Sequence, residues 1–412
     1  MMRIIIILYF FFCTCVNGYA RLLNIGKQCT YPSIKLAIQS ASYGDTLYVH
    51  PGVYKEGNII ISKTLTLIGL SSPVVDGDHK VEVFSVKAPS VSIKGFHICN
   101  VGRSNINDWA AIKIYNQPNC VIENNVIRQA FFGIYLQYAN RTIIKNNILT
   151  CNILREQDAG NGIHCWRSDS LQIIGNKVNG HRDGIYFEFV TNSIIWRNIS
   201  SNNIRYGLHF MFSNNDSYCN NIFNYNGAGV AVMFSKYVTM FSNTFTYNWG
   251  DAAYGILLKE ISDSYIQGNK FSNNTCGIFM EGTSRIILVK NIFHLNGWAL
   301  KLQANCIDIS LMKNAFTANS FDVATNGNTV LNFFTNNYWD KYEGYDLNKD
   351  GIGDVPFRPV SLFSSIMEKN PTTSIMFRSL ITTLMDKAEK VFPSLTPMDL
   401  LDTKPLIKNP LQ

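Results

Sequence analysis

Methionine and histidine recur at short spacing in the middle of the chain, and these residue types are well suited to metal chemistry. His209 and Met211 are two residues apart, and Met233 follows Met211 after 22 residues. Thioether sulfur and imidazole nitrogen favour a soft ion such as Cu(I), whereas hard cations select oxygen ligands. These three residues are therefore candidate copper ligands. The alternative is an apolar strip that packs beneath a loop or beneath the C-terminal segment.

A second group of candidate ligands lies near the C-terminus. Oxygen side chains alternate ahead of a glycine in residues 346–354, as in the first half of a calcium-binding loop. The bidentate glutamate of a complete EF-hand loop is missing, because Phe357 stands at that position. The pattern predicts calcium as a structural clip, with a plain Asx-rich turn as the alternative. The predicted ligands are Asp346, Asn348, Asp350 and Asp354.

The elements that must position these residues are short strands in a repeat. A glycine followed by an alternating apolar run recurs at intervals of mostly 22 or 23 residues, and longer intervals such as 133–162 and 229–255 indicate loop insertions. Such a period, with no helical pattern in it, predicts an all-β fold, a right-handed parallel β-helix with coils about 4.8 Å apart. Asparagines keep the same period and are expected to stack inward: Asn125, Asn147, Asn176, Asn221, Asn243, Asn269, Asn291 and Asn314.

The period also sorts residues into inward and outward columns. The first and third positions after each glycine are apolar and point inward, so the second and fourth positions point outward. This places His209, Met211 and Met233 on one outer face. His164 and Glu188 lie lower on the same face and are weaker candidate ligands.

The chain divides into four predicted segments. Residues 1–20 combine an early positive charge, an apolar run and small residues before Ala20, which predicts a cleaved export signal and a periplasmic protein. The β-helix is expected over 21–340, the Asp/Asn/Gly-rich loop over 341–360 and a C-terminal arm over 361–412. A helical pattern over 31–41 predicts a short N-terminal cap. A second helical pattern over 371–392 predicts an amphipathic helix, which is either a cap or a docking arm.

Composition and spacing exclude several classes of function. The net charge is +7, but lysines and arginines are scattered, which argues against nucleic acid binding. No Cys-x-x-Cys spacing occurs, so neither a zinc motif nor a thioredoxin-like motif is present. A polysaccharide lyase or hydrolase would need clustered acids, and none share an outward position closely enough. We expect no enzymatic activity, with a carbohydrate-active enzyme and a structural β-helical surface protein as alternatives. The candidate residues for an enzyme would be Asp183, Glu188, Asp251 and Lys259.

Ordered motifs over about residues 30–406 resemble the NosD family of nitrous oxide reductase maturation proteins. They include GHRDGIYFEF at 180–189, RYGLHFM at 205–211, NGAG at 226–229, NGWAL at 296–300, NYWD at 337–340 and VFPSLTP at 391–397. Phe210 and Phe212 stand where the resemblance leads us to expect tyrosines.

The resemblance implies a periplasmic β-helix that supplies copper to nitrous oxide reductase. It implies an ABC transporter partner made of the ATPase NosF and the membrane protein NosY, and a link to the copper chaperone NosL. The C-terminal arm would then dock on the transporter, which would be the only contact with the membrane. It also favours His209, Met211 and Met233 as copper-binding residues.

Overall fold

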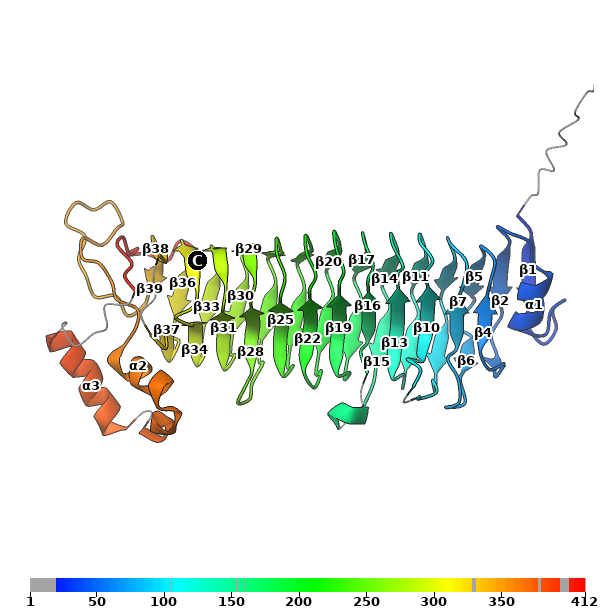
Figure 1. Ribbon diagram of the computed structural model, residues 1–412, viewed down its shortest axis with the longest axis horizontal. Coiled ribbons are helices and arrows are strands. Elements are labelled where there is room, and N and C mark those ends of the chain that lie inside the picture. The colour runs from blue at the N-terminus through cyan, green and yellow to red at the C-terminus, as the bar shows by residue number, and fades with distance from the viewer. Residues whose placement is uncertain are drawn as a thin grey trace, which may run out of the picture.

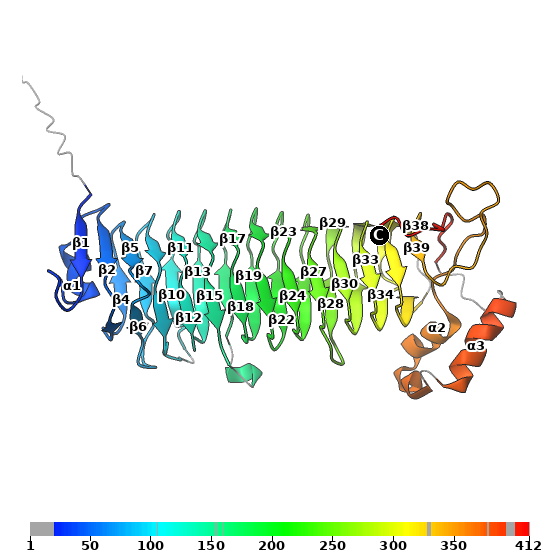
Figure 2. The same cartoon turned by 180° about the vertical axis from the view of Figure 1, so that it is seen from behind.

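The computed structural model describes residues 20–411, apart from 105, 153, 154, 159, 328–330, 377, 378 and 393–399. The predicted export signal therefore lies outside the described residues, except for Ala20. In the described part of the chain, short strands wind into a right-handed parallel solenoid of about 13 turns (Figures 1 and 2). This confirms the fold class predicted from the repeat.

Each coil contributes one strand to each of three parallel sheets, which we call A, B and C. Across the described residues they hold 14, 13 and 12 strands, respectively. Sheet A contains β1 (Leu22–Ile25), β2 (Thr46–Val49), β5 (Thr66–Gly69), β8 (Ser92–Lys94), β11 (Val121–Glu123), β14 (Ile143–Lys145), β17 (Gln172–Ile174), β20 (Ile194–Trp196), β23 (Ser217–Cys219), β26 (Thr239–Phe241), β29 (Ser262–Gln267), β32 (Ser284–Val289), β35 (Ile307–Met312) and β38 (Phe333–Thr335).

Sheets B and C complete the triangular cross-section. Sheet B contains β3 (Val53–Tyr54), β6 (Val74–Asp76), β9 (His97–Cys99), β12 (Val126–Arg128), β15 (Ile148–Thr150), β18 (Lys177–Asn179), β21 (Ile199–Ser201), β24 (Ile222–Asn224), β27 (Thr244–Thr246), β30 (Lys270–Ser272), β33 (Ile292–His294), β36 (Ala315–Thr317) and β39 (Tyr338–Trp339). Sheet C contains β4 (Ile59–Ile61), β7 (Phe84–Val86), β10 (Ala110–Tyr115), β13 (Phe132–Gln137), β16 (Ile163–Trp166), β19 (Asp183–Glu188), β22 (Tyr206–Met211), β25 (Ala228–Met233), β28 (Tyr254–Lys259), β31 (Cys276–Glu281), β34 (Trp298–Leu302) and β37 (Phe321–Ala324).

The interior is held by stacked side chains of one kind. Phe271 and Phe293 stack with ring centroids 4.8 Å apart and nearly parallel planes. At a buried corner, the backbone N and the Nδ2 of Asn243 both donate to Oδ1 of Asn269, at 2.8 and 3.0 Å. The expected asparagine ladder is confirmed, and it satisfies polar groups that would otherwise be costly to bury.

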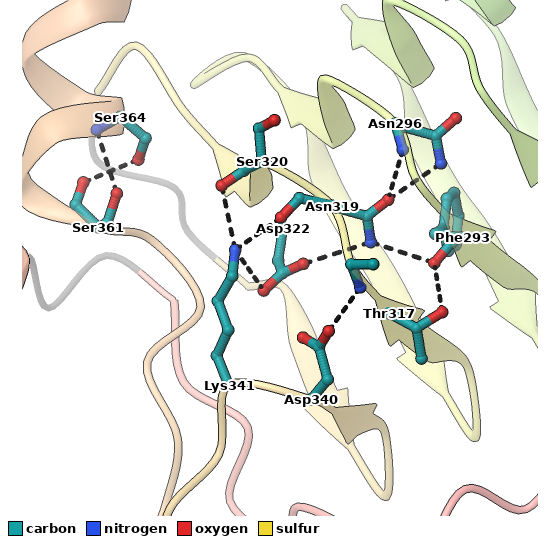
Figure 3. Close-up of polar contacts among 11 residues, drawn as sticks. Phe293, Asn296, Thr317, Asn319, Ser320, Asp322, Asp340, Lys341, Ser361 and Ser364 are labelled. Atoms are coloured by element: carbon teal, nitrogen blue, oxygen red, sulfur yellow. Dashed lines mark hydrogen bonds and ion pairs between the residues drawn. The ribbon is translucent and has the colours of Figure 1, made fainter. Parts of the chain in front are cut away.

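A second asparagine ladder ends close to the C-terminal arm (Figure 3). The backbone N of Asn296 donates to Oδ1 of Asn319 at 3.0 Å, and Nδ2 of Asn319 donates to the carbonyl of Phe293 at 3.1 Å. Asp322 is buried beside Asn319, and Nζ of Lys341 lies 3.4 Å from its carboxylate. The lysine thus neutralises an acid at the point where the ladder stops.

Helices lie at both ends of the solenoid, and a one-turn 3₁₀ helix, η1 (Glu156–Asp158), lies in a loop between β15 and β16. The helix α1 (Ile34–Ser40) begins at Ser33, whose Oγ accepts from Leu36 N at 3.2 Å. It buries Ile34, Ala37 and Ile38, which belong to the continuous apolar core. The predicted N-terminal cap is present.

The C-terminal arm differs in detail from the single helix predicted over 371–392. The chain forms α2 (Leu362–Lys369), a 3₁₀ helix η2 (Pro371–Met376) and α3 (Leu380–Val391). The threonine- and serine-rich residues of η2 have low helix propensity, and a new helix starts only after the Ser379 cap. Phe363 of α2 packs on Phe321 of β37.

Candidate metal-binding face

The outer face of sheet C carries the candidate copper ligands. Met211 of β22 pairs in register with Met233 of β25, and Glu188 of β19 pairs with Met211. Adjacent coils are about 4.8 Å apart, so the two thioethers lie side by side on neighbouring strands. Both methionines are half-buried. The repeat therefore predicts their pairing, and their role as ligands stays a prediction.

His209 is less accessible than the alternating pattern suggests, because its side chain is only 6% exposed. Its ring packs between the rings of Tyr186 and Tyr206, at centroid distances of 4.9 and 4.7 Å. Its Nδ1 lies 3.8 Å from Oδ2 of Asp183. The imidazole thus leans toward the start of the strand, whereas Met211 lies at its end.

Asp183 is a neighbour of His209 that the sequence pattern does not place on this face. A Cβ on Gly184 would lie 2.6 Å from the carbonyl of Gly207, next to inward-facing side chains. Gly184 and Ile185 therefore both face the interior. This break in alternation turns Asp183 outward, and a bulge at each repeat glycine is the signal that could have revealed it.

Charge stabilises the buried Asp183 carboxylate. Burial opposes its ionisation, yet the neighbouring His209 and Arg182 hold the pKa of Asp183 below its ordinary value. Nη2 of Arg182 lies 3.3 Å from Oδ2 of the carboxylate. Asp183 is thus a fixed negative charge that orients the imidazole of His209.

His164 occupies a similar position two coils below His209. Its ring lies between Tyr135 and Tyr186, at centroid distances of 4.4 and 4.8 Å, and its Nδ1 is 3.0 Å from Nδ2 of Asn161. Burial lowers the pKa of His164 to about 3, so the imidazole is neutral at neutral pH. Two coils separate His164 from His209 by about 10 Å, which is too far for both to bind one ion.

The donors on this face suit a soft ion better than a hard one. Within the described ranges, no three His, Cys, Asp or Glu side chains gather into a group that could hold a metal ion. A copper site here would depend on the thioethers of Met211 and Met233, with His209 or Glu188 as a further ligand. Thioethers favour Cu(I).

The predicted calcium loop uses its carboxylates to bind its own backbone. Asp346 Oδ2 accepts from Gly351 N at 2.9 Å, and Asp350 Oδ1 accepts from Ile352 N at 2.8 Å. Asp354 Oδ2 accepts from the amide N at position 347, at 2.8 Å. These bonds form an Asx-rich turn. The calcium site, which would also include Asn348, stays a prediction. It can be tested by measuring the melting temperature at increasing calcium concentrations.

Comparison with known proteins shows which family the chain resembles. A NosD family profile, described as periplasmic copper-binding protein (NosD), matches residues 150–344. A protein from Pseudomonas aeruginosa named probable ABC transporter binding protein NosD is 26% identical over 373 residues, covering 86% of each chain. A protein of the same name from Stutzerimonas stutzeri is 26% identical over 389 residues, covering 90% of this chain and 88% of its own. The chain therefore resembles NosD proteins over most of its length. The resemblance seen in its motifs is therefore confirmed.

Solved structures similar to this chain share its fold at low sequence identity. A pneumococcal surface adhesin, PfbA, has a TM-score of 0.60 at 14% identity, covering 71% of this chain and 88% of its own. The A-module of the Azotobacter vinelandii mannuronan epimerase AlgE6 has a TM-score of 0.55 at 14% identity, covering 74% and 89%. One is an adhesin and the other an enzyme, so these similarities establish the β-helix alone.

The relatives also bear on location and partners at a coarse level. The family is described as periplasmic, and both relatives are named as binding proteins of an ABC transporter. None of the helices in the described part of the chain is long and apolar enough to cross a membrane.

Proposed function

We propose that this protein is a non-enzymatic periplasmic partner of a copper-related ABC transporter and serves the assembly of the copper centres of nitrous oxide reductase. The observation that carries the proposal is similarity to the NosD family, combined with the paired methionines on sheet C. The transporter would consist of NosF and NosY, and the copper would come from NosL. The export signal in residues 1–20 would deliver the chain to the periplasm.

Copper would bind as Cu(I) at the face formed by Met211, Met233 and His209. The methionines are adjacent, and His209 would complete the site by turning its ring away from Asp183. Half-burial keeps the thioethers partly out of water while leaving an approach for a chaperone. His164 and Glu188 lie lower on the same face and are the weaker candidate ligands. Glu188 pairs directly with Met211, whereas His164 lies two coils below His209.

The C-terminal arm would dock on the transporter. Its helix α3 carries a stripe of exposed apolar side chains, with Leu380 76% exposed. A stripe of this kind is typical of a helix that packs on a partner. The stripe consists of Leu380, Ile381, Leu384 and Val391.

Movement of the arm would trigger release of the copper, and this movement would be transmitted through the coils of the solenoid. The inner helix α2 contacts β34 through an ion pair between Lys301 and Glu368, at 2.5 Å. Sheet C places β34 three strands beyond the Met233 strand, about 14 Å away. The arm therefore does not cover the methionines, and any coupling must pass through the intervening coils.

Cu(I) competition titrations test the site. The double variant Met211→Leu with Met233→Leu keeps the volume and removes both sulfur atoms, so we expect the affinity for Cu(I) to fall about tenfold or more. His209→Gln should weaken it less. Met376→Leu, at an exposed methionine of the arm, is the matched control and should bind as the wild type does. Unchanged affinity in the double variant would remove these ligands from the proposal.

A further inference from the structure

Two loop insertions lie at the same corner of the solenoid. The long intervals at 133–162 and 229–255 both add residues between a strand of sheet B and the next strand of sheet C, namely between β15 and β16 and between β27 and β28. Figure 1 shows both loops projecting from the same side of the molecule. The sheet B to sheet C connections of the coils between them are short.

A pocket of about 280 Å³ opens at this corner, beside the second insertion. A Cβ on Gly227 would lie 2.5 Å from the carbonyl of Ile204, so only glycine fits where these two segments meet. Trp249 stands on the second insertion and is 58% exposed, unlike the rings of the core. The main lining residues are Ile204, Arg205, Tyr206, Gly227, Trp249 and Ala253.

Arg205 gives the pocket its charge. Its guanidinium lies 4.8 Å from the centroid of the Tyr206 ring and donates from Nη2 to the Tyr206 hydroxyl at 3.4 Å. Nη1 lies 3.4 Å from Oε1 of Glu156, which stands on the first insertion. The two insertions therefore meet at this arginine: one supplies an aromatic wall, and the other supplies a weakly held carboxylate.

We propose that this pocket binds a small molecule whose six-membered ring carries a carboxylate. The planar guanidinium of Arg205 matches a carboxylate in a bidentate geometry. The exposed Trp249 offers a ring face on which a six-membered ring packs, and Tyr206 adds the apolar edge of its ring. A volume of about 280 Å³ is near the lower limit of ligand pockets, which suits one ring.

Glu156 would then compete with the ligand for the guanidinium of Arg205. Its carboxylate occupies the arginine that the carboxylate of the ligand needs, and the long 3.4 Å separation indicates a weak pair. The ligand would displace Glu156, whose side chain is largely exposed and returns to water at little cost. This binding does not require copper, but the pocket adjoins the proposed copper site, because the ring of Tyr206 also packs against His209.

Ligand-observed NMR titrations of the mature chain test the proposal. Glucuronate and benzoate represent a sugar acid and an aromatic acid, while glucose and benzyl alcohol are the matched uncharged rings. We expect saturable binding of at least one acid, about tenfold or more tighter than its uncharged counterpart. Binding of glucuronate alone assigns a sugar acid, and binding of benzoate alone assigns an aromatic acid.

Variants that are expected to change the ligand affinity in opposite directions make the test more specific. Arg205→Gln and Trp249→Ala should each weaken binding, whereas Glu156→Gln should tighten it severalfold because the competitor is gone. Arg285→Gln breaks an exposed ion pair with Asp263 away from the pocket and should change nothing. The proposal is overturned if neither acid binds, if Arg205→Gln binds as the wild type does, or if Glu156→Gln weakens binding. Because Glu156→Gln keeps every main lining residue, its predicted gain tests the pocket even if Arg205→Gln unfolds.

Discussion

Three histidines of neighbouring coils are buried or half-buried, and their surroundings give them different roles. His164 accepts or donates one hydrogen bond with Asn161, and His209 leans on the carboxylate of Asp183. His181 lies inside the solenoid, where its ring nitrogens have no hydrogen-bond partner among the described residues. Burial lowers the pKa of His181 to about 4. Position in the coil, rather than residue type, thus separates candidate ligands from packing residues.

Replacing His181 tests this assignment. Its backbone N donates to Oδ1 of Asn203 at 3.0 Å, as the ladder asparagines do, so His181→Asn should add one rung. The unfolded imidazole takes a proton near pH 6.5, before the folded one, so stability is present above pH 6.5 and is lost as the pH falls toward about 4. The loss is up to about 1.4 kcal/mol per pH unit in that window.

Urea denaturation at several pH values measures the effect. The unfolding free energy of His181→Asn should be less sensitive to acid than that of the wild type, with the remaining sensitivity assigned to His164. His79→Asn, at an exposed histidine, should leave the profile unchanged. A parallel acid loss in His181→Asn and the wild type would contradict the assignment.

Residue positions were predictable where the repeat is regular and not where it bends. The pairing of Met211 with Met233 follows directly from the 22-residue period. The contact between His209 and Asp183 does not, because strict alternation places Asp183 inside. Gly184 faces the interior, close to the carbonyl of Gly207 in the next coil. This inward glycine moves Asp183 to the outer face.

At the scale of elements, the asparagine ladder that contains Asn243 and Asn269 ends on a residue from a distant segment of the chain. Asn337 is the final asparagine, and its backbone N and Nδ2 donate to Oδ2 of Asp402 at 3.1 and 3.0 Å. Nε1 of Trp339 donates to the same oxygen at 2.9 Å. A carboxylate accepts but cannot donate, so the ladder stops there.

Asp402 should therefore matter more than a loop residue normally does. Asp402→Leu removes the acceptor of three buried hydrogen bonds, and we expect the unfolding free energy to fall by about 3 kcal/mol or more. Asp402→Asn keeps an accepting oxygen and should lose about 1 kcal/mol. Urea denaturation checks both, with the exposed Asp308→Asn as the control. Equal stability of Asp402→Leu and Asp402→Asn would show that the cap contributes little.

The elements at the two ends differ in how far sequence could predict them. The cap α1 has a local helical pattern and begins at a serine, so its sequence was sufficient. The return of the chain near Asp402 to the end of the solenoid has no local signal, because its partners are more than sixty residues away in sequence. The inner helix α2 was missed for a similar reason, since packing on β37 stabilises it.

For the whole molecule, the solenoid is a spacer between the methionine pair of sheet C and the C-terminal arm. Each coil pairs only with the coils above and below, so stability is approximately a sum over neighbours. The distance between β25 and β34 is therefore set by the number of coils. If the arm drives copper release, that distance should be part of the mechanism.

Removing one coil tests the spacer directly and rests on the proposed function. Deletion of residues 277–298 removes 22 residues and joins Cys276 to Ala299. Ile256 would then pair with Leu300, which pairs with Ile278 in the intact chain. Asn269 would donate to Asn314 and keep the ladder continuous. We expect a folded protein by circular dichroism that binds Cu(I) as the wild type does, because the methionine face lies below the deletion.

The shortened protein should nevertheless fail to support maturation of nitrous oxide reductase. Its arm would lie about 5 Å closer to the methionines, so docking and copper transfer could no longer occur together. Copper content of the reductase, measured in cells that carry the deletion, is the readout. Normal copper content would mean that the arm and the copper face work independently. A protein that folds but loses Cu(I) binding would instead show that the methionine face extends beyond its own two coils.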